Sequence, residues 1–372
     1  KPGTSLRLTI DRDIQFVAEN AISNAVKKSN ALSGTVIVMD PKTGEILAHA
    51  TAPSFDPNNT KKLKLEDFRN PSVQDVYDPG STGKVMTMAA AIEDGLVKPD
   101  TVFTVPYSVK RYNATIKDHE FHPTQRLTTT GILAVSSNVG SIQVGEKVGS
   151  TNLYNYLRKF GIGSSTTSGL PGESDGLLPP VNKWSGTSLT TFSIGQGYSV
   201  TAMQATQVFA TIANDGVRVS PTVIAGTEDS AGRFTPAKKR NEVKVISAET
   251  AKTLRAMLES VVSANGTAPE AAIPGYRVAG KTGTAMRHDS SCNCYKGYTA
   301  SFIGFAPADN PKYVVSVTIQ RPQGLHWGGA LGGPVFKEVM SFVLQSKQVA
   351  PTGGQITPMA LNEAEVKNVK TN

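Results

Sequence analysis

The sequence predicts an α+β fold, in which strands from the two ends of the chain form one antiparallel sheet and helices pack on it. Short apolar runs bounded by turn residues, which are typical of strands, occur near the N-terminus and in the last third of the chain. Between them, apolar residues recur at helical spacing. Two long polar segments, 51–80 and 161–199, lie within this inserted helical region, and a cleft could form there.

The N-terminal residues predict a strand, a helix and a hairpin. Alternating apolar residues predict the strand at Ser5–Ile10. The helix that follows, Asp11–Lys28, has apolar residues at helical spacing, namely Ile14, Val17, Ala18, Ala21, Ile22 and Ala25. Two further strands, Thr35–Met39 and Glu45–Ala50, flank the turn Pro41–Gly44 and therefore form a hairpin.

The middle of the chain predicts mostly helices. The first polar segment ends in Asp78-Pro79-Gly80, after which strong helix formers predict a helix over Val85–Glu93 that ends at Gly95. Residues 97–125 are predicted to be irregular. The other predicted helical stretches are 128–148 (a pair broken near Ser136–Gly140), Thr151–Phe160 before Gly161, Thr201–Asn214 and Ala248–Ala264.

The last third of the chain returns to strands. The predicted strands are Tyr276–Ala285, Thr299–Ala306 and Tyr313–Gln320, and their short turns favour antiparallel pairing. A helix over Val335–Leu344 follows. We therefore expect one domain over residues 1–347 and a polar tail over 348–372 that is disordered or an extension.

Composition narrows the function classes. An apolar content of 39% excludes wholesale disorder in this 372-residue chain. The net charge of +8 is scattered, with short clusters at Lys61-Lys62 and Lys238-Lys239-Arg240 and no basic stripe interleaved with aromatic residues. We therefore expect no nucleic-acid binding. No apolar run approaches the roughly 18 residues of a membrane span. The chain starts at Lys1 without Met or a signal sequence, as a fragment or a mature form does.

The first group of residues that can carry chemistry is Ser81-Thr82-Gly83-Lys84. Ser81 and Lys84 lie on the same helical face, close to a helix N-terminus that favours developing negative charge. A neutral Lys84 amine could take the proton of the Ser81 hydroxyl and make it a nucleophile. The alternative is that Ser81 caps a helix and Lys84 is solvated, because this motif is common by chance.

A second group, Ser136-Ser137-Asn138, interrupts a run of apolar helical residues. By itself the group is typical of a helix break. Polar side chains inside an apolar stretch nevertheless need partners, and the wall of a cleft would supply them.

A third group, Lys281-Thr282-Gly283-Thr284, ends a predicted strand. Lys281 brings a positive charge, and the hydroxyls of Thr282 and Thr284 suit an anionic carboxylate. Gly283 removes a side chain where the backbone of a ligand could lie along the strand edge. The alternative is an ordinary strand with an edge lysine.

The order and spacing of the three groups are far more specific than any one of them. S-x-x-K, S-x-N 55 residues later and K-T-G a further 145 residues on form the signature of penicillin-interacting serine enzymes. From Leu6 to about Leu344 the sequence resembles the penicillin-binding proteins, specifically the transpeptidase domain of the monofunctional class B type. Ala285 after K-T-G-T favours class B over class A, and Asp78 stands where relatives more often have Glu. Other segments that carry the resemblance are Asp40–Ala48, Arg69-Asn70, Tyr77–Ser81, Gly195-Gln196-Gly197, Val200-Thr201 and Gly332–Phe336.

The resemblance implies a penicillin-binding/β-lactamase-like transpeptidase fold and a role for each of the first two motifs. Ser81 is expected to be the acylated nucleophile and Lys84 its general base. Ser136 and Asn138 are expected to pass protons and to hold the amide of the substrate. No cofactor is expected.

The third motif and the backbone complete the implied site. Lys281 is expected to orient charge across the cleft, and Thr282 and Thr284 to hold the carboxylate of a terminal D-Ala or of a β-lactam. The backbone N–H groups of Ser81 and Thr284 are expected to form the oxyanion hole. Two lysines facing one cleft also favour a neutral Lys84, because like charge and desolvation both lower the pKa of an amine.

The function that the resemblance implies is a D,D-transpeptidase, of the division type more than the elongation type, that cross-links peptidoglycan stem peptides and is inhibited by β-lactams. A glycosyltransferase and other division or elongation proteins are expected partners. The expected location is the extracytoplasmic face of the bacterial cell membrane, with an anchoring helix upstream of Lys1. Two alternatives are a serine β-lactamase and a β-lactam sensor domain. The β-lactamase alternative lacks support, because there is no E-x-x-L-N element between Ser136 and Lys281. Arg69-Asn70 and Gly195-Gln196-Gly197 argue against the sensor domain.

Two sets of residues outside the motifs are also chemically notable. Cys292 and Cys294 lie in a loop expected to overhang the active site, and in an oxidising compartment they could pair as a strained disulfide. With His288 nearby they offer at most three metal ligands, so no metal site is expected. His119 and His122 have the wrong spacing for a zincin helix and are interpreted as ordinary polar or half-buried side chains.

Overall fold

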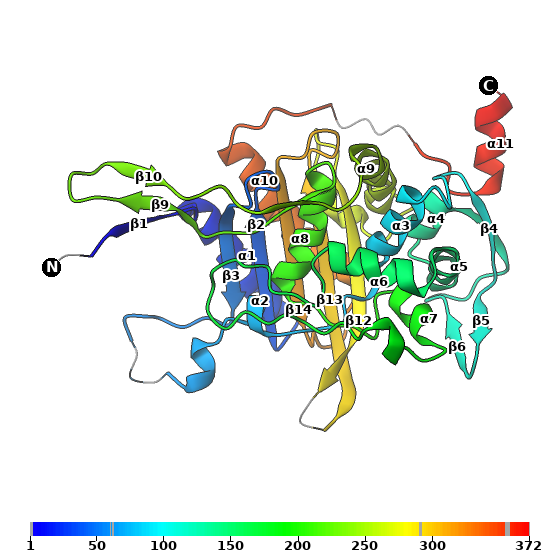
Figure 1. Cartoon of the computed structure of the whole chain (residues 1–372), viewed down its shortest axis with the longest axis horizontal. Helices are drawn as coiled ribbons and strands as arrows, with labels where there is room; N and C mark the ends of the chain where they lie inside the picture. The colour runs from blue at the N-terminus through cyan, green and yellow to red at the C-terminus, as the bar shows by residue number, and fades with distance from the viewer. Residues whose placement is uncertain (1–2, 60, 62, 290–291, 354–357, 372) are drawn as a thin grey trace.

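A computed structural model of the chain describes residues 3–59, 61, 63–289, 292–353 and 358–371, so Lys62 of the first basic cluster lies outside the described residues. A five-stranded antiparallel sheet forms the centre of the molecule, in the order β12-β13-β14-β2-β3 (Figure 1). Its strands are β2 (Ser33–Met39), β3 (Ile46–Ala52), β12 (Ala279–Asp289), β13 (Cys294–Ala306) and β14 (Tyr313–Gln320). The predicted α+β fold, with the N-terminal hairpin and the C-terminal strands in one sheet, is confirmed.

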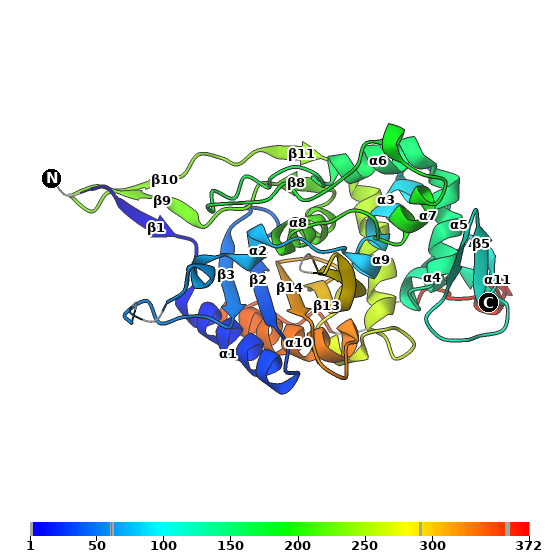
Figure 2. The same cartoon turned by 90° about the horizontal axis from the view of Figure 1, so that it is seen from below.

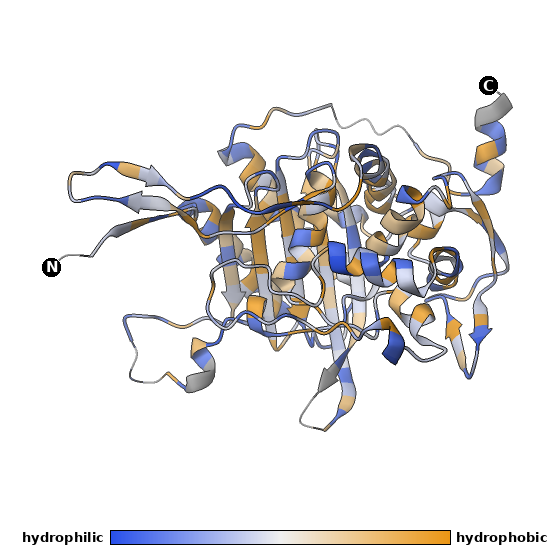
Figure 3. Cartoon of the chain, in the orientation of Figure 1, coloured by the Kyte–Doolittle hydropathy of each residue, from blue (hydrophilic) through white to orange (hydrophobic). Residues whose placement is uncertain are grey.

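Helices cover both faces of this sheet, which explains why its central strands are apolar on both sides. The helices α1 (Arg12–Lys28) and α10 (Gly328–Ser346) lie against one face, and α8 (Ala202–Ala213) lies against the other (Figure 2). Every residue of α8 is buried. Hydrophobic residues therefore gather in the sheet and the helices that sandwich it (Figure 3).

The helices α1, α8 and α9 begin close to where the sequence predicts, and each has a side-chain cap at its first turn. Asp11 accepts hydrogen bonds from the first turn of α1, and Thr201 with Gln204 forms a capping box at the start of α8. Ser247 caps α9 (Ala248–Val262) in the same way. The remaining helical elements are η2 (Leu65–Phe68), α2 (Pro71–Gln74), η3 (Gly80–Thr82), α3 (Lys84–Glu93), α4 (Thr129–Ala134), α5 (Asn138–Val148), α6 (Ser150–Lys159), η4 (Val181–Lys183), α7 (Ser188–Ser193), η5 (Pro269–Ala271) and α11 (Glu363–Thr371).

The prediction that residues 97–125 are irregular is wrong. This segment and the residues just after it form two small antiparallel pairs, β4 with β7 and β5 with β6. Their bounds are β4 (Val102–Val105), β5 (Ser108–Arg111), β6 (Ala114–Lys117) and β7 (Gln125–Thr128). Each strand has only four residues, too few for an alternating pattern to stand out from the surrounding polar residues.

The first predicted strand forms, but outside the central sheet. It is β1 (Ser5–Leu8), and it pairs with β9 (Ile224–Glu228), which also pairs with β10 (Phe234–Pro236). These strands form an arm that projects from the molecule near the N-terminus (Figure 1). The last pair is β8 (Val217–Val219) with β11 (Glu242–Lys244).

The closing helix is longer than predicted, because α10 begins at Gly328 and not at Val335. The glycines before Pro334 predict a loop, yet they lie in the helix. Glycine is needed there because the helix packs closely against the sheet and leaves no room for a side chain. A Cβ on Gly328 would lie 2.3 Å from the carbonyl oxygen of Gly283, and one on Gly332 would lie 2.9 Å from the backbone nitrogen of Phe302.

The described part of the tail contacts the main body of the molecule beside β7 and α4. Thr128 Oγ1 donates a 2.7 Å hydrogen bond to the carbonyl oxygen of Ala360, and the Thr128 N–H donates to Leu361. A Cβ on Gly131 of α4 would lie 1.9 Å from the Leu361 oxygen, so this glycine admits the tail. Of the helices that the structure describes, none is long and apolar enough to cross a membrane.

Candidate active site

Ser81 lies on a tight turn at the entrance to a helix. The turn is the 3₁₀ element η3, and α3 continues from it without a break. Gly80 has a φ of +54°, and its N–H donates a 2.8 Å hydrogen bond to the carbonyl oxygen of Gly195. Ser81 is partly exposed on this turn, with its backbone N–H at the start of the helix.

The Gly195-Gln196-Gly197 segment buttresses the Ser81 turn. Gly195 has a φ of +81°, and a Cβ on it would lie 1.9 Å from the carbonyl oxygen of Gly80. Asp78 accepts hydrogen bonds from the Gly197 N–H at 3.2 Å and the Ser199 hydroxyl at 3.1 Å. The shorter Asp78 side chain therefore ties the two segments together.

Lys84 joins the first motif to the second. Its Nζ donates to the carbonyl oxygen of Ser136 at 2.6 Å and to Oδ1 of Asn138 at 2.7 Å, and Ser136 Oγ lies 3.4 Å away. A neutral amine has two N–H bonds, so these two short contacts leave its lone pair available for a hydroxyl proton. The interpretation of Lys84 as a solvated side chain is excluded, because it is fully buried.

The pKa of Lys84 is lowered to about 7. Burial lowers this pKa, and the negative charge of the nearby Asp118 carboxylate partly offsets the effect. The pKa of Lys281 is also lowered, first by burial and then by the charge of Lys84. The like-charge effect predicted for Lys84 therefore acts on Lys281 in the structure. A pKa near neutrality suits Lys84 to the role of a general base.

The third motif lies on β12, facing the other two. Lys281 is fully buried, and its Nζ donates to Thr282 Oγ1 at 3.2 Å. Thr282 Oγ1 also shares a 2.9 Å hydrogen bond with Thr267 Oγ1, and Thr284 Oγ1 accepts from the Gly328 N–H at 3.1 Å. Thr282 and Thr284 both line the cleft.

Gly283 packs closely against the turn that carries Ser81. A Cβ there would lie 2.3 Å from Ser301 Oγ and 3.0 Å from both the Pro79 oxygen and Thr82 Cγ2. The missing side chain therefore makes room for the turn that carries Ser81.

These motifs meet at a cleft of about 1040 Å³. Its residues come from the Ser81 turn, the strands β6 and β12, the loop after β6 and the start of α10. Among the predicted site residues, Ser81, Ser136, Asn138, Thr282 and Thr284 line it. Lys84, Gly283 and Lys281 lie behind this surface.

Sequence reasoning missed several residues of the cleft wall. They are Asp118, Glu120, Phe121, Glu270 and Trp327. His119 and His122 also line the cleft, and the centroids of the His119 and Trp327 rings lie 4.1 Å apart. No local signal marks these residues, because β6 is too short for its alternating pattern to stand out and Asp118 directly follows it. In the described residues, no three His, Cys, Asp or Glu side chains gather as a metal site.

Cys292 and Cys294 form a disulfide in the hairpin between β12 and β13. The hairpin extends beyond the sheet in Figure 1. The side chain of His288 lies outside the described residues.

Alkylation should leave Cys292 and Cys294 unmodified in the native protein, because a disulfide has no free thiol. After reduction, both cysteines are expected to be alkylated. Intact-protein mass before and after reduction measures this, and alkylation without reductant would show that the bridge is absent.

Known protein sequences are similar to this chain over nearly its whole length. Residues 34–341 match the family described as the penicillin binding protein transpeptidase domain. The chain is 42% identical over 370 residues to penicillin-binding protein PbpB of Mycolicibacterium smegmatis, covering 96% of this chain and 57% of that protein. It is 36% identical over 366 residues to peptidoglycan D,D-transpeptidase FtsI of Escherichia coli, covering 97% and 60%. The chain thus spans little more than half the length of these relatives.

Solved structures agree with the fold. Penicillin-binding protein 3 of Mycobacterium tuberculosis, complexed with aztreonam, superposes with a TM-score of 0.90 and 38% identity, covering 97% of this chain and 82% of that one. The transpeptidase domain of penicillin-binding protein 3 from Burkholderia pseudomallei gives a TM-score of 0.81 and 33% identity, covering 95% and 99%.

Proposed function

We propose, because this chain belongs to the family of penicillin-binding protein transpeptidase domains, that it cross-links peptidoglycan stem peptides through an acyl-enzyme on Ser81. The observation that carries the proposal is the Lys84 amine, which is buried, has a pKa lowered to about 7 and lies against Ser136 and Asn138. Its neighbour along the chain, Ser81, lines the adjoining cleft. The proposed base and the proposed nucleophile are therefore separated by about one helical turn.

In the first half-reaction, the Ser81 hydroxyl attacks the carbonyl carbon of the penultimate D-Ala, and its proton goes to Lys84. The backbone N–H groups of Ser81 and Thr284 hold the resulting oxyanion. The terminal D-Ala leaves as an amine, which receives the proton that Lys84 took, passed through the Ser136 hydroxyl. The 3.4 Å separation between Lys84 Nζ and Ser136 Oγ supports that proton path.

The second half-reaction releases Ser81. The amine of another stem peptide attacks the ester carbonyl and loses a proton to Lys84 through the same path. The bond between the acyl carbon and Ser81 Oγ then breaks, Lys84 returns the proton to Ser81 Oγ, and the new amide is the cross-link. Asn138 holds the amide of the bound peptide, and its own Nδ2 is fixed by a 2.9 Å hydrogen bond to the Lys117 oxygen.

The substrate carboxylate is held by the third motif. Thr282 and Thr284 present hydroxyls on one strand, and both line the cleft. Lys281 lies behind them and orients the Thr282 hydroxyl through its 3.2 Å hydrogen bond.

We place this reaction on the extracytoplasmic face of the bacterial cell membrane, where stem peptides are cross-linked. The relatives named penicillin-binding protein PbpB and peptidoglycan D,D-transpeptidase FtsI support the reaction itself. A role in cell division, with a glycosyltransferase and division proteins as partners, is part of this proposal. β-Lactams should acylate the same serine, as suggested by solved relatives complexed with ampicillin and aztreonam.

A long-lived acyl-enzyme is the expected result of a pulse of benzylpenicillin, with deacylation taking hours. Hydrolysis needs a water molecule that a base deprotonates, and no E-x-x-L-N element is present to supply one. Each ~1.4 kcal/mol of added barrier slows a step tenfold, so a deficit of several kcal/mol relative to a β-lactamase is implied. Intact-protein mass spectrometry measures the adduct, and Ser81→Ala is the control that should give none.

Two outcomes would point elsewhere. An adduct that clears within seconds, with many turnovers of nitrocefin, would make the protein a serine β-lactamase. A stable adduct without any release of D-Ala from a stem-peptide substrate would favour a β-lactam sensor.

A further inference from the structure

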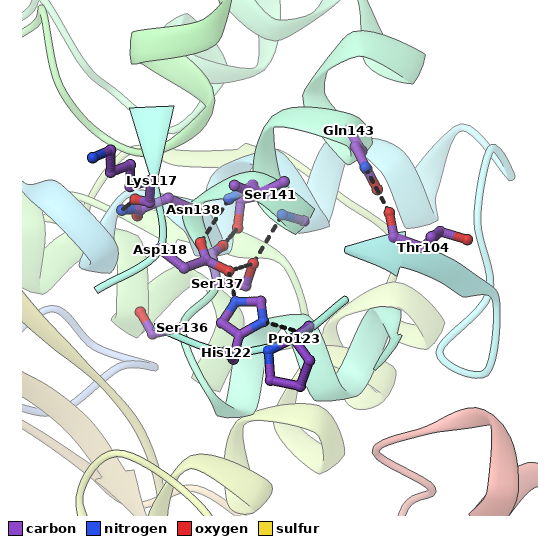
Figure 4. A network of polar contacts seen from close by, with 12 residues as sticks. Thr104, Lys117, Asp118, His122, Pro123, Ser136, Ser137, Asn138, Ser141 and Gln143 are labelled. Atoms are coloured by element: carbon purple, nitrogen blue, oxygen red, sulfur yellow. Dashed lines mark hydrogen bonds and ion pairs between the residues drawn. The ribbon is translucent and has the colours of Figure 1, made fainter. Parts of the chain in front are cut away.

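Asp118 is a buried carboxylate beside the second motif, and its contacts are drawn in Figure 4. It directly follows β6. Its Oδ2 accepts a 2.6 Å hydrogen bond from the Ser137 hydroxyl, and its Oδ1 accepts a 2.9 Å hydrogen bond from the Val139 N–H. The preceding residue, Lys117, accepts from Asn138 Nδ2. The end of β6 therefore binds three consecutive residues at the start of α5.

These contacts bear on Ser136, which has a φ of +62°. A non-glycine residue in this region is strained and persists only where its surroundings impose it. Ser137 is locked on the far side of the strained residue: its N–H donates to the Ile132 oxygen at 3.0 Å, and its hydroxyl donates to Asp118. The strained conformation turns the Ser136 carbonyl oxygen to within 2.6 Å of Lys84 Nζ.

His122 completes the environment of the carboxylate. Its Nε2 lies 3.1 Å from Asp118 Oδ2, and its Nδ1 lies 2.7 Å from the carbonyl oxygen of Pro123. His122 therefore bridges the Asp118 carboxylate and the backbone of the loop after β6. Both residues line the cleft, and Asp118, which is 8% exposed, contacts His122 on one side and the start of α5 on the other.

We propose that Asp118, oriented by His122, is a positioning residue for acyl transfer, holding the Ser136-Ser137-Asn138 segment in the strained form that engages Lys84. This rests on the proposed function of Ser81 and Lys84. Asp118 touches neither the nucleophile nor the amine through a hydrogen bond in the described structure, and it acts through Ser137 and Val139.

The charge of Asp118 gives the proposal a second readout. The charged groups that face Lys84 are Asp118 from the end of β6 and Lys281 from β12, and Ser136 and Asn138 are uncharged. Asp118 raises the pKa of Lys84, whereas the like-charge effect lowers the pKa of Lys281. The Asp118 charge favours the protonated amine, so it raises the pKa of Lys84 against the effect of burial. Neutralising Asp118 should therefore lower the pKa of Lys84 and move the acidic limb of the acylation rate to lower pH.

Asp118→Asn tests the proposal. The amide has nearly the size of the carboxylate, but its single oxygen cannot replace the two oxygens that accept from Ser137 and Val139. Glu93→Gln is the matched control: Glu93 Oε2 accepts a 2.8 Å hydrogen bond from Ser247, the N-cap of α9, as Asp118 accepts from Ser137, the N-cap of α5. Rates of acylation by benzylpenicillin are measured from about pH 5 to pH 9 for wild type and both variants, with thermal unfolding in parallel.

The expected result for Asp118→Asn is a loss of at least about tenfold in acylation rate at the high-pH plateau, with the acidic limb at lower pH. Glu93→Gln should change neither. A folded Asp118→Asn protein with the wild-type rate and pH profile would overturn the proposal, as would a change in unfolding temperature alone. If Asp118→Asn does not fold, His122→Ala, which keeps the carboxylate but removes one of its donors, should slow acylation, and a wild-type rate would overturn the proposal.

Failure of the proposed function is recognised separately. Wild-type protein that is not acylated by benzylpenicillin would refute the acyl-enzyme. The pKa of Lys84, read by nitrogen NMR of labelled lysine in wild type and Asp118→Asn, still tests the coupling. A lower pKa in the variant supports the link, and an unchanged value refutes it.

Discussion

A Lys84→Met variant is expected to be acylated by a labelled penicillin at least about 100 times more slowly than the wild type, because the general base is lost. The sequence placed Lys84 on the wall of a cleft, but the structure buries it fully, so removing the whole side chain would leave a cavity. Methionine fills most of that volume. Lys347→Met is the matched control, because Lys347 is paired with Asp11 at 2.7 Å and lies outside the cleft.

The pH dependence of the wild-type acylation rate should reflect the ionisation of Lys84. Acylation requires neutral Lys84, whose pKa is lowered to about 7. Its rate should therefore rise with pH through about 7 and fall about tenfold for each pH unit below it. Labelling of folded Lys84→Met at nearly the wild-type rate, or a wild-type rate that is flat between about pH 5 and pH 8, would contradict the assignment.

A Gly195→Ala variant is expected to lose both stability and acylation. Its φ of +81° is strained for alanine, which costs about 1 kcal/mol, and its Cβ would lie 1.9 Å from the carbonyl oxygen of Gly80. Relieving that contact moves the backbone next to Ser81 and breaks the hydrogen bond between Gly80 and Gly195. Displacing the nucleophile by about 1 Å costs on the order of 100-fold in rate.

Gly95→Ala separates strain from collision. Gly95 also has a positive φ, +66°, but nothing lies within 4 Å of its Cβ position. This control should lose a similar amount of stability from strain and keep its acylation rate. Thermal unfolding and acylation by a fluorescent penicillin measure both effects. Equal acylation rates in the two variants would mean that the Gly80–Gly195 contact does not position Ser81.

The central sheet and the helices that cover it could be predicted from sequence because their signals are local, and the three motifs could be recognised because their order and spacing are specific. Apolar residues at helical spacing and Ser or Thr caps mark α8 and α9. The two ends of the chain contain the apolar strands of one sheet, and the spacing of Ser81, Ser136 and Lys281 resembles one family. All of these signals can be read from the order of residues along the chain, without knowledge of the contacts that form on folding.

The remaining features depend on contacts between distant segments. The four-residue strands β4 to β7 gain their stability from partners, and the glycines at the start of α10 join a helix because the sheet approaches closely. Gly283 makes room for the Ser81 turn, which no local pattern reveals. The lowered pKa of Lys84 and the position of Asp118 follow from burial and proximity. Both are properties of the space around a side chain, and that space exists only after the chain has folded.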